Sequence, residues 1–204
     1  AGVTMDELWW LTESVEKSGK VYMFAENYCY IPQNQVIRAI NAAGLFGTPY
    51  FAEGEYLHGI TDRLLYPNGK ASWRKYWQLG KRGAFYPTHS FGPVSQWLDG
   101  DTVESVTTLS SGQHRAQELG LIQDDTTITL CRMRSGALVK IRLDCMSKRP
   151  HNLTYYSLQG TKGCYEAPRG LGDEHKIWIE DIHGEPDNPQ WYPLADFYDE
   201  YMPE

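Results

Sequence analysis

Two short segments carry the residue types that acid/base chemistry needs. The first, residues 53–59 (EGEYLHG), holds Tyr56 and His58. Side chains two residues apart on a β-strand project to the same face, so the phenol and the imidazole are expected to lie side by side. Such a pair can act as an acid/base relay. The alternative is a tyrosine and a histidine that only satisfy each other's hydrogen bonds on a half-buried strand.

The second segment, residues 86–94 (YPTHSFGPV), places His89 where a helix is expected to begin. The positive end of a helix dipole disfavours a charged imidazole, which favours a neutral base near pH 7. Gly92 and Pro93 weaken the start of a helix, and Gly92 leaves room for another group to approach the backbone closely. The alternative is a histidine that only caps the helix.

Aromatic residues are frequent in this chain, with 14 Tyr, 7 Trp and 6 Phe. Aromatic rings stack on the C–H faces of sugars while neighbouring polar groups bind the hydroxyls, so this composition favours a carbohydrate cleft. A sheet core or an oligomer interface is the alternative. Residues 60–86 are irregular, aromatic and basic, and long irregular inserts are usually functional. We predict substrate-binding roles for Arg63 of this insert and for His58, Tyr86 and Thr88.

Several other classes of site and partner find no support in the sequence. No Gly-x-Gly-x-x-Gly loop and no metal-ligand spacing of His, Asp, Glu or Cys occurs, so no metal site is predicted. The net charge is −7 and no basic stripe is visible, which argues against nucleic acid as a partner. No apolar run approaches the ~20 residues that a membrane span needs. The 4 cysteines form no CxxC pair, which is typical of reduced thiols in a cytoplasmic protein. Because the chain begins with Ala1 rather than Met, a removed leader stays an open alternative.

The first thirty residues are predicted to be the end of another domain. Thr4 and Glu7 have the spacing of a capping box, and Gly19 supplies a helix stop. Residues 21–25 (VYMFA) form a short apolar run typical of a buried strand. A helix followed directly by a buried strand is half of a βαβ unit. We therefore interpret residues 1–30 as the end of a parallel α/β domain that begins upstream.

Residues 31–204 are predicted to form a substrate-binding and oligomerisation domain. Pro32 begins a helix that ends at Gly44, residues 50–58 form a strand, and Thr88 caps a third helix that runs through Trp97. Further strands are predicted at residues 103–109, 126–133, 137–145, 155–158, 163–166 and 177–182, with hairpin turns at residues 135–136 and 160–163. Successive strands joined by short turns imply a mostly antiparallel sheet.

The predicted fold class is therefore α+β, with an open, mostly antiparallel sheet that carries helices on one face. It is preceded by the end of the parallel α/β domain. The uncovered face of the sheet needs cover, and a second copy of the chain is the economical candidate. We predict a homo-oligomer through this face. The chain stops at Glu204 without a closing element, so the domain is interpreted as truncated there.

The residues of both segments resemble a known superfamily. Residues 16–59 (EKSGKVYMFAENYCYIPQNQVIRAINAAGLFGTPYFAEGEYLHG) are similar to the domain junction of the glucose–fructose oxidoreductase/inositol dehydrogenase/MocA superfamily. The segment YPTHSFGPV resembles the helix start that carries the active-site histidine there. The combination of EGEYLH with PTHSFGPV is similar to the branch that contains NAD-dependent α-N-acetylgalactosaminidases. The resemblance extends over essentially the whole chain.

The resemblance implies an N-terminal, dinucleotide-binding Rossmann domain that binds most of an NAD or NADP cofactor, and residues 1–30 would be its C-terminal remnant. It also implies a C-terminal open-sheet domain and frequent oligomers. It implies that His89 is the base near the oxidised hydroxyl and that Tyr56 is an acid or base. It further implies that His58 binds or orients the substrate. Glu26 and Asn27 would lie near the nicotinamide end of the cofactor.

The resemblance leaves three functions open. We predict the substrate-binding part of an NAD(P)-dependent oxidoreductase that acts on a hydroxyl of a sugar or sugar derivative, or of a polyol. An NAD-dependent glycoside hydrolase is the first alternative; it would oxidise a sugar hydroxyl, eliminate the glycoside, add water and reverse the oxidation. A non-catalytic assembly or binding module is the second. By itself the chain is predicted to be inactive, because nothing in it holds the pyrophosphate.

Overall fold

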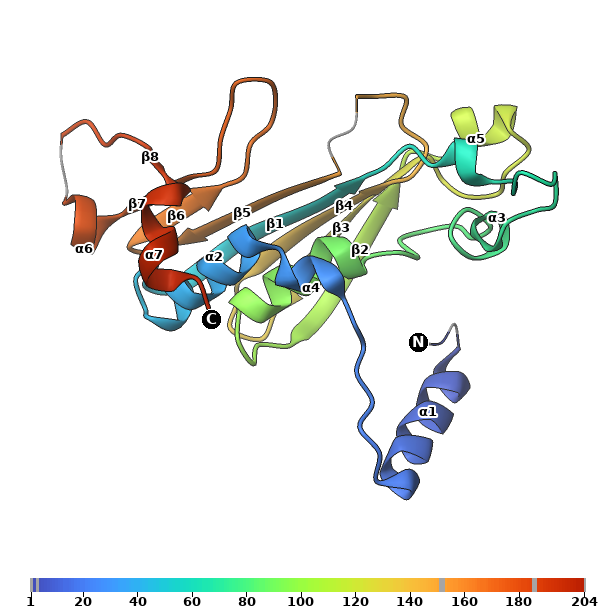
Figure 1. The fold of residues 1–204 in the computed structure, drawn as a ribbon, viewed down its shortest axis with the longest axis horizontal. Helices are drawn as coiled ribbons and strands as arrows, with labels where there is room; N and C mark the ends of the chain where they lie inside the picture. Colours follow the sequence, from blue (N-terminus) through green and yellow to red (C-terminus); the bar gives the residue numbers. More distant parts are fainter. Residues whose placement is uncertain (1, 3, 151–152, 185–186, 204) are drawn as a thin grey trace.

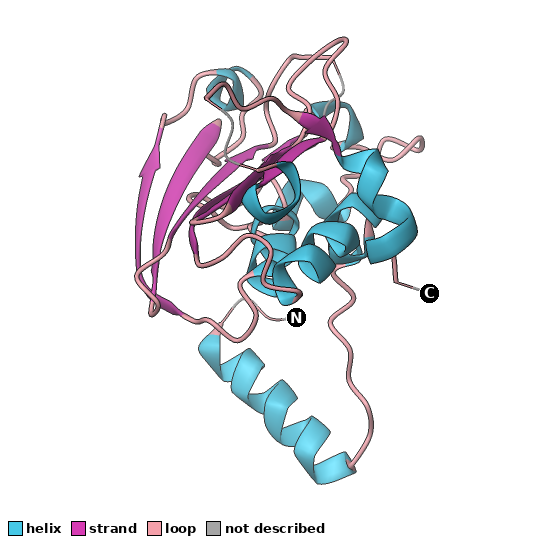
Figure 2. Ribbon diagram, turned by 90° about the vertical axis from the view of Figure 1, so that its left-hand side faces the viewer, coloured by secondary structure: helices cyan, strands magenta, loops and turns pink. Residues whose placement is uncertain are grey.

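The structure, a computed structural model, describes residues 2, 4–150, 153–184 and 187–203. These residues form one eight-stranded sheet in the order β2-β3-β4-β1-β5-β6-β7-β8, with the helices of the body gathered on one of its faces (Figure 2). Every described strand pair is antiparallel except β1 with β4. The predicted fold class is thereby confirmed. The strands are β1 (Pro49–Leu57), β2 (Val103–Ser110), β3 (Thr126–Met133), β4 (Leu138–Asp144), β5 (Thr154–Gly160), β6 (Gly163–Glu166), β7 (Lys176–Ile179) and β8 (Tyr192–Pro193).

Two helices cover the middle of the sheet and position the site (Figure 1). Helix α2 (Pro32–Ala42) has Pro32 at its first position, as predicted, and buries the side chains of Val36, Ile37 and Ile40. Helix α4 (Thr88–Trp97) lies against β1. No helix among the described residues is long and apolar enough to cross a membrane. The remaining elements are α1 (Met5–Ser18), α3 (Trp73–Trp77), α5 (Arg115–Glu118), α6 (Glu180–His183), α7 (Tyr198–Tyr201) and the 3-10 helices η1 (Asn27–Tyr30), η2 (Thr61–Arg63) and η3 (Leu194–Phe197).

Two predicted boundaries are wrong. Thr88 is the first residue of α4 rather than its cap; the cap position belongs to Pro87, which has no side-chain group to cap the helix. The strand predicted at residues 177–182 ends at Ile179, and α6 follows it. Acidic residues suit the first turn of a helix, and Glu180 and Asp181 occupy that turn of α6.

The N-terminal segment agrees with its prediction only in part. The capping box of α1 is formed, with Glu7 N–H donating to Thr4 Oγ1 at 3.2 Å, and the helix ends at Gly19 in the left-handed region. The buried strand predicted at residues 21–25 is wrong: this stretch is outside any strand, and Val21 is 97% exposed. A strand needs a partner for its backbone groups. The extended stretch leads away from the sheet to α1, which stands apart from the body (Figure 1).

The core lies between the sheet and its helices in two clusters. The larger cluster joins α2 and α4 to the strands and includes the aromatic rings of Trp97, Tyr156 and Tyr165. The smaller cluster lies beneath the insert that follows β1 and includes Tyr56 and Leu79. It supports the residues that the sequence nominates for chemistry, because the rings of Tyr28 and Tyr86 pack against it.

One glycine on β1 lets α4 lie directly on the sheet. A Cβ placed at Gly54 would be 1.9 Å from the backbone oxygen of Ser90, inside any possible contact distance. Gly54 therefore lets the backbone of α4 rest on that of β1. This close approach carries His89, one residue before Ser90, to the side of the sheet on which Tyr56 lies.

The sheet face away from the helices is uncovered in the described structure. Near the β2 edge this open face exposes large apolar side chains, and nearer the middle it carries ion pairs. Lys140 Nζ lies 2.5 Å from Glu53 Oε1, and Arg169 Nη1 lies 3.1 Å from Glu55 Oε2. The exposed apolar residues of this face are Leu109, Ile128, Leu130 and Leu138.

Candidate active site

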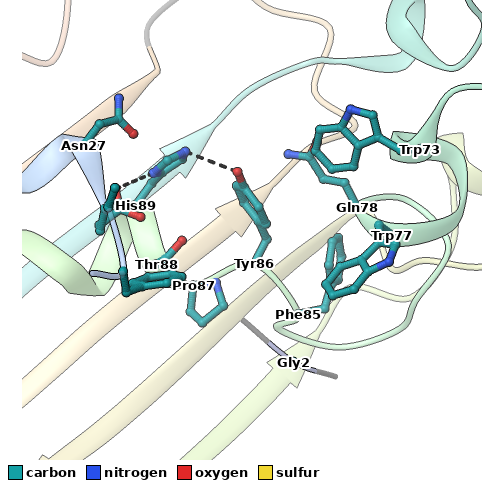
Figure 3. Close-up of a pocket in the computed structure, with 13 residues that line it drawn as sticks. Gly2, Asn27, Trp73, Trp77, Gln78, Phe85, Tyr86, Pro87, Thr88 and His89 are labelled. Carbon is teal, nitrogen blue, oxygen red and sulfur yellow. Dashed lines mark hydrogen bonds and ion pairs between the residues drawn. The ribbon is translucent and has the colours of Figure 1, made fainter. Parts of the chain in front are cut away.

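His89 is held by contacts on several sides at the first turn of α4. Its Nδ1 lies 2.6 Å from Glu26 Oε1 (Figure 3). The ring of Tyr28 stacks on the imidazole with centroids 3.9 Å apart and 13° between the planes. The hydroxyl of Tyr156 donates to the backbone oxygen of His89 at 2.5 Å. These contacts join α4 to Glu26, to η1 and to strand β5, so the position of the ring depends on tertiary structure.

Tyr56 and His58 lie on the same face of β1, as their spacing predicts. The Tyr56 hydroxyl is 2.5 Å from His58 Nδ1, and the two residues are only 4% and 8% exposed. Burial raises the pKa of Tyr56 far above that of a free phenol, so the hydroxyl keeps its proton and can donate a hydrogen bond to the imidazole. The ring of Tyr56 meets that of His89 edge-on, with centroids 4.9 Å apart. Tyr56 therefore packs against the His89 ring from the protein interior, outside the cavity lining.

A cavity of about 480 Å³ opens in front of His89. This volume lies within the range of small-molecule sites. One end is polar and the other is aromatic (Figure 3). The aromatic rings come mostly from the insert, and Trp73 and Trp77 are 48% and 50% exposed. The predicted residues at the polar end are Glu26, Asn27, Tyr86, Thr88 and His89.

The structure does not bring every predicted residue to this cavity. Arg63 is exposed and is not among the residues that line it. Tyr56 and His58 do not line the cavity either, although Tyr56 touches residues that do. The roles that the sequence assigns to these side chains stay predictions.

The basic side chain next to the tyrosines is Arg74. Burial raises the pKa of Tyr56 and Tyr86, and the Arg74 guanidinium partly opposes that rise. Arg74 also lies over the ring of Trp73 at 4.5 Å and donates to Gln78 Oε1. The sequence indicates a basic insert but does not single out Arg74 within it. Its spacing of four residues from Gln78 on α3 was the available signal.

Gln78 adds an unsatisfied donor to the aromatic end. Its side chain is 1% exposed, and its Nε2 finds no hydrogen-bond partner among the described residues. A buried amide without a partner costs roughly 1–3 kcal/mol, so each such group calls for a reason. Gln78 lines the cavity. A polar ligand atom that enters beside Arg74 would supply the missing acceptor after a small shift of this side chain.

The described residues contain no set of side chains that could bind a metal ion. Across residues 2, 4–150, 153–184 and 187–203, no group of three or more His, Cys, Asp and Glu side chains is arranged to hold a metal ion. The cavity instead offers an imidazole, phenols, amides and aromatic faces. Such a set can bind a ligand that carries both hydroxyl groups and apolar faces, and it can accept a proton from one of those hydroxyls.

Sequence comparison relates the chain to one group of proteins. A family model for the "Glycosyl hydrolase 109, C-terminal domain" matches residues 36–123. A "Glycosyl hydrolase family 109 protein" of Saccharopolyspora erythraea is 32% identical over 98% of this chain and 45% of its own length. An "Alpha-N-acetylgalactosaminidase" of Shewanella oneidensis is 28% identical over 95% of this chain and 48% of its own length. The chain thus spans about half the length of the curated relatives that it matches.

Structural comparison identifies the fold. A levoglucosan dehydrogenase in complex with NADH and levoglucosan superposes with a TM-score of 0.68 at 20% identity, over 88% of this chain and 48% of that one. The fold is that of the C-terminal domain in this group of NADH-binding oxidoreductases. Together the sequence and structural relatives confirm the resemblance to the glucose–fructose oxidoreductase/inositol dehydrogenase/MocA superfamily that the sequence predicts.

Proposed function

We propose, on the premise of this superfamily resemblance, that the chain is the substrate-binding part of an NAD(P)-dependent enzyme that acts on a hydroxyl of a sugar or polyol. One observation carries the proposal: His89 lies at the polar end of an aromatic cavity, with its Nδ1 on Glu26 and its Nε2 3.4 Å from the Tyr86 hydroxyl. An imidazole in such a place can take the proton of a bound alcohol.

The roles of the side chains follow from their positions. His89 Nε2 would accept the hydroxyl proton as the O–H bond of the substrate breaks. Tyr86 and Thr88 line the same end of the cavity and would bind neighbouring hydroxyls, while Trp77 would stack on a C–H face of the ring. His58 would act at one remove, because it fixes the hydroxyl of Tyr56.

The cofactor would be bound by a domain of which the first thirty residues form the end. An exposed, extended apolar stretch leads directly into Glu26 and Asn27, which line the cavity. If that stretch joined a parallel sheet, the nicotinamide end of a dinucleotide would lie beside Asn27. When bound, the nicotinamide supplies the acceptor for the hydrogen and two electrons of the carbinol carbon. We therefore propose residues 1–30 as the end of a dinucleotide-binding domain and residues 31–204 as the substrate-binding domain.

A glycoside hydrolase that oxidises its substrate transiently is the second candidate. The family model and the named α-N-acetylgalactosaminidase favour it. So does one feature of the site, since this reaction moves protons at both the oxidised hydroxyl and the neighbouring carbon. The cavity offers two groups for them, the His89 imidazole and the Tyr86 hydroxyl. A simple dehydrogenase needs only one.

The deciding experiment uses the protein with its dinucleotide-binding domain. The protein is denatured, and the released small molecules are assayed for nicotinamide by absorbance and mass. It is then offered nitrophenyl glycosides and free sugars. Retained NAD with release of nitrophenol and no net NADH supports the hydrolase. Reversible NAD(P) binding with NADH formation supports the dehydrogenase. Absence of any nicotinamide binding would contradict both and leave a non-catalytic assembly module.

We further propose that the open face of the sheet pairs with a second copy of the chain. Leu109→Asp would place a charge among the exposed apolar residues of that face and is expected to weaken the dimer by at least ~100-fold. Light scattering coupled to size-exclusion chromatography measures the change. Val106→Asp is the matched control, because Val106 is an exposed residue of the same strand that points to the other face. Equal effects of the two variants would contradict the proposed interface.

We also propose a cytoplasmic location, on the state of the cysteines. All four cysteines are free thiols, namely Cys29, Cys131, Cys145 and Cys164. Burial raises the pKa of the Cys145 thiol to about 12, which keeps it protonated and unreactive. Unpaired, buried cysteines are typical of a reducing compartment. Localisation of a tagged protein with its native N-terminus tests this proposal.

A further inference from the structure

We infer that Glu26 is a positioning residue that keeps the Nε2 of His89 free to accept a proton, and that Gly92 is present in α4 to let Glu26 reach the ring. The inference depends on the proposed function only for the identity of the ligand in front of His89. Which nitrogen of His89 carries the proton is a property of this chain, because it depends on the groups that surround the ring.

The first step is the direction of the bond between the two side chains. Glu26 Oε1 accepts the backbone N–H of Tyr28 at 3.1 Å and lies 2.6 Å from His89 Nδ1. A carboxylate oxygen offers only acceptor sites. The ring therefore donates a hydrogen bond from its Nδ1–H group to Glu26 Oε1. A neutral imidazole carries only one N–H, so its Nε2 then has a lone pair.

The second step concerns what Nε2 faces. The Tyr86 hydroxyl lies 3.4 Å from it, at the border of the cavity. Burial raises the pKa of Tyr86, so this phenol stays protonated near neutral pH and acts as a donor toward Nε2. A ligand hydroxyl beside Tyr86 would find the same acceptor. Proton transfer would break its O–H bond and form an N–H bond at Nε2, while Glu26 stabilises the resulting imidazolium.

Contacts with neighbouring rings also hold the imidazole in this orientation. Tyr28 stacks on one side, and the rings of Tyr56 and Tyr86 meet the imidazole edge-on with centroids 4.9 and 5.2 Å away. A rotation of the ring would move Nδ1 off Glu26 and place a C–H group against the carboxylate. The tautomer is therefore set by Glu26 rather than by a choice of rotamer.

The last step is the role of Gly92. A Cβ placed there would lie 2.8 Å from Glu26 Cγ and 3.2 Å from Cys29 Sγ. The glycine has no positive φ, so backbone conformation does not require it. Inside a helix glycine is less favourable than alanine. The remaining reason for its presence is the space that Glu26 and η1 occupy.

The test measures the histidine tautomer in the chain itself. Long-range proton–nitrogen NMR spectra of the ¹⁵N-labelled protein distinguish an Nδ1–H from an Nε2–H imidazole when the ring is neutral, and the missing signal of His89→Gln assigns the resonance. The parent is expected to show Nδ1–H at His89. Because a hydrogen bond to a charged group is stronger than one between neutral groups, Glu26→Ala is expected to lower the ratio of Nδ1–H to Nε2–H by at least ~10-fold. Glu26→Gln keeps an acceptor oxygen and is expected to retain most of the parent ratio.

Gly92→Ala provides the independent variant. It should change the tautomer ratio in the same direction as Glu26→Ala, although alanine is the better helix former. Gly170→Ala is the matched glycine control, because its Cβ would meet no atom within 4 Å, and Glu53→Ala is the matched acid control on the open face. Both controls should leave the ratio unchanged.

Retention of Nδ1–H in Glu26→Ala would overturn the inference, and so would an unchanged ratio in a folded Gly92→Ala. If Glu26→Ala does not fold, the tautomer ratio of Gly92→Ala decides the test. If Gly92→Ala does not fold, the ratio of Glu26→Ala decides it. An absence of nicotinamide binding would contradict the proposed function but would not affect the conclusion about the His89 tautomer. If the function holds, Glu26→Ala should lower kcat with little change in KM, because Glu26 acts through His89.

Discussion

His89→Ala, in the protein with its dinucleotide-binding domain, is expected to lower kcat on its sugar substrate by ~10²-fold or more, which is the usual contribution of a general base. The imidazole is the described side chain at the polar end of the cavity that is built to accept a proton, since burial keeps the Tyr86 phenol protonated. KM should change less than kcat, because Tyr86, Thr88 and the aromatic end would still hold the ligand. Steady-state kinetics measure both quantities.

His114→Ala is the control for this prediction. His114 lies in an exposed loop, where its Nε2 approaches the backbone oxygen of Ser111 at 3.0 Å. Its loss should leave kcat unchanged. If His89→Ala keeps activity within a factor of two of the parent, the general-base role is wrong and the site needs another proton acceptor.

Gly54→Ala is expected to destabilise the fold by about 3 kcal/mol or more, at the upper end of what overpacking usually costs. The added Cβ would lie 1.9 Å from the Ser90 oxygen and 2.8 Å from the Ser90 carbonyl carbon. Both atoms belong to the backbone, so no side chain can turn away, and α4 must lift from β1. Urea unfolding followed by circular dichroism measures the loss of free energy.

The same variant should also disturb the site. Lifting α4 moves His89 relative to Tyr56, so the histidine NMR signals should broaden or shift even below the unfolding transition. Gly170→Ala again serves as the control, because the space around Gly170 is open. If Gly54→Ala lowers the free energy of unfolding by less than about 1 kcal/mol, α4 and β1 can move apart at little cost in stability. The close approach at Gly54 would then not be what positions His89.

Local patterns predicted those elements that neighbouring residues decide. The capping box of Thr4 and Glu7, the proline start of α2 and the hairpin turns depend on contacts a few residues apart, and each forms as expected. The same holds for the Tyr56–His58 pair, because strand geometry alone puts both side chains on one face. The position of His89 at the start of a helix also follows from its neighbours.

The failures are places where a distant partner decides. Residues 21–25 have the composition of a buried strand, yet a strand forms only where a neighbouring strand accepts its hydrogen bonds, and none of the described strands does so. The parallel pairing of β1 with β4 joins segments separated by the whole insert, α4 and a hairpin. Composition could not distinguish Arg63 from Arg74, because both are basic residues of one irregular insert.

The sequence by itself determined the class of fold, the superfamily resemblance and the nomination of His89, since these depend on residue types and short spacings. Only the tertiary structure decided that Glu26, 63 residues away in the chain, is the partner of His89. It also decided that Gly92 makes room for that carboxylate and that Tyr28 stacks on the imidazole. The physical reason is that the proton arrangement of an imidazole depends on which groups lie within about 3 Å of each nitrogen. Such distances arise only when α4, β1 and η1 are packed together.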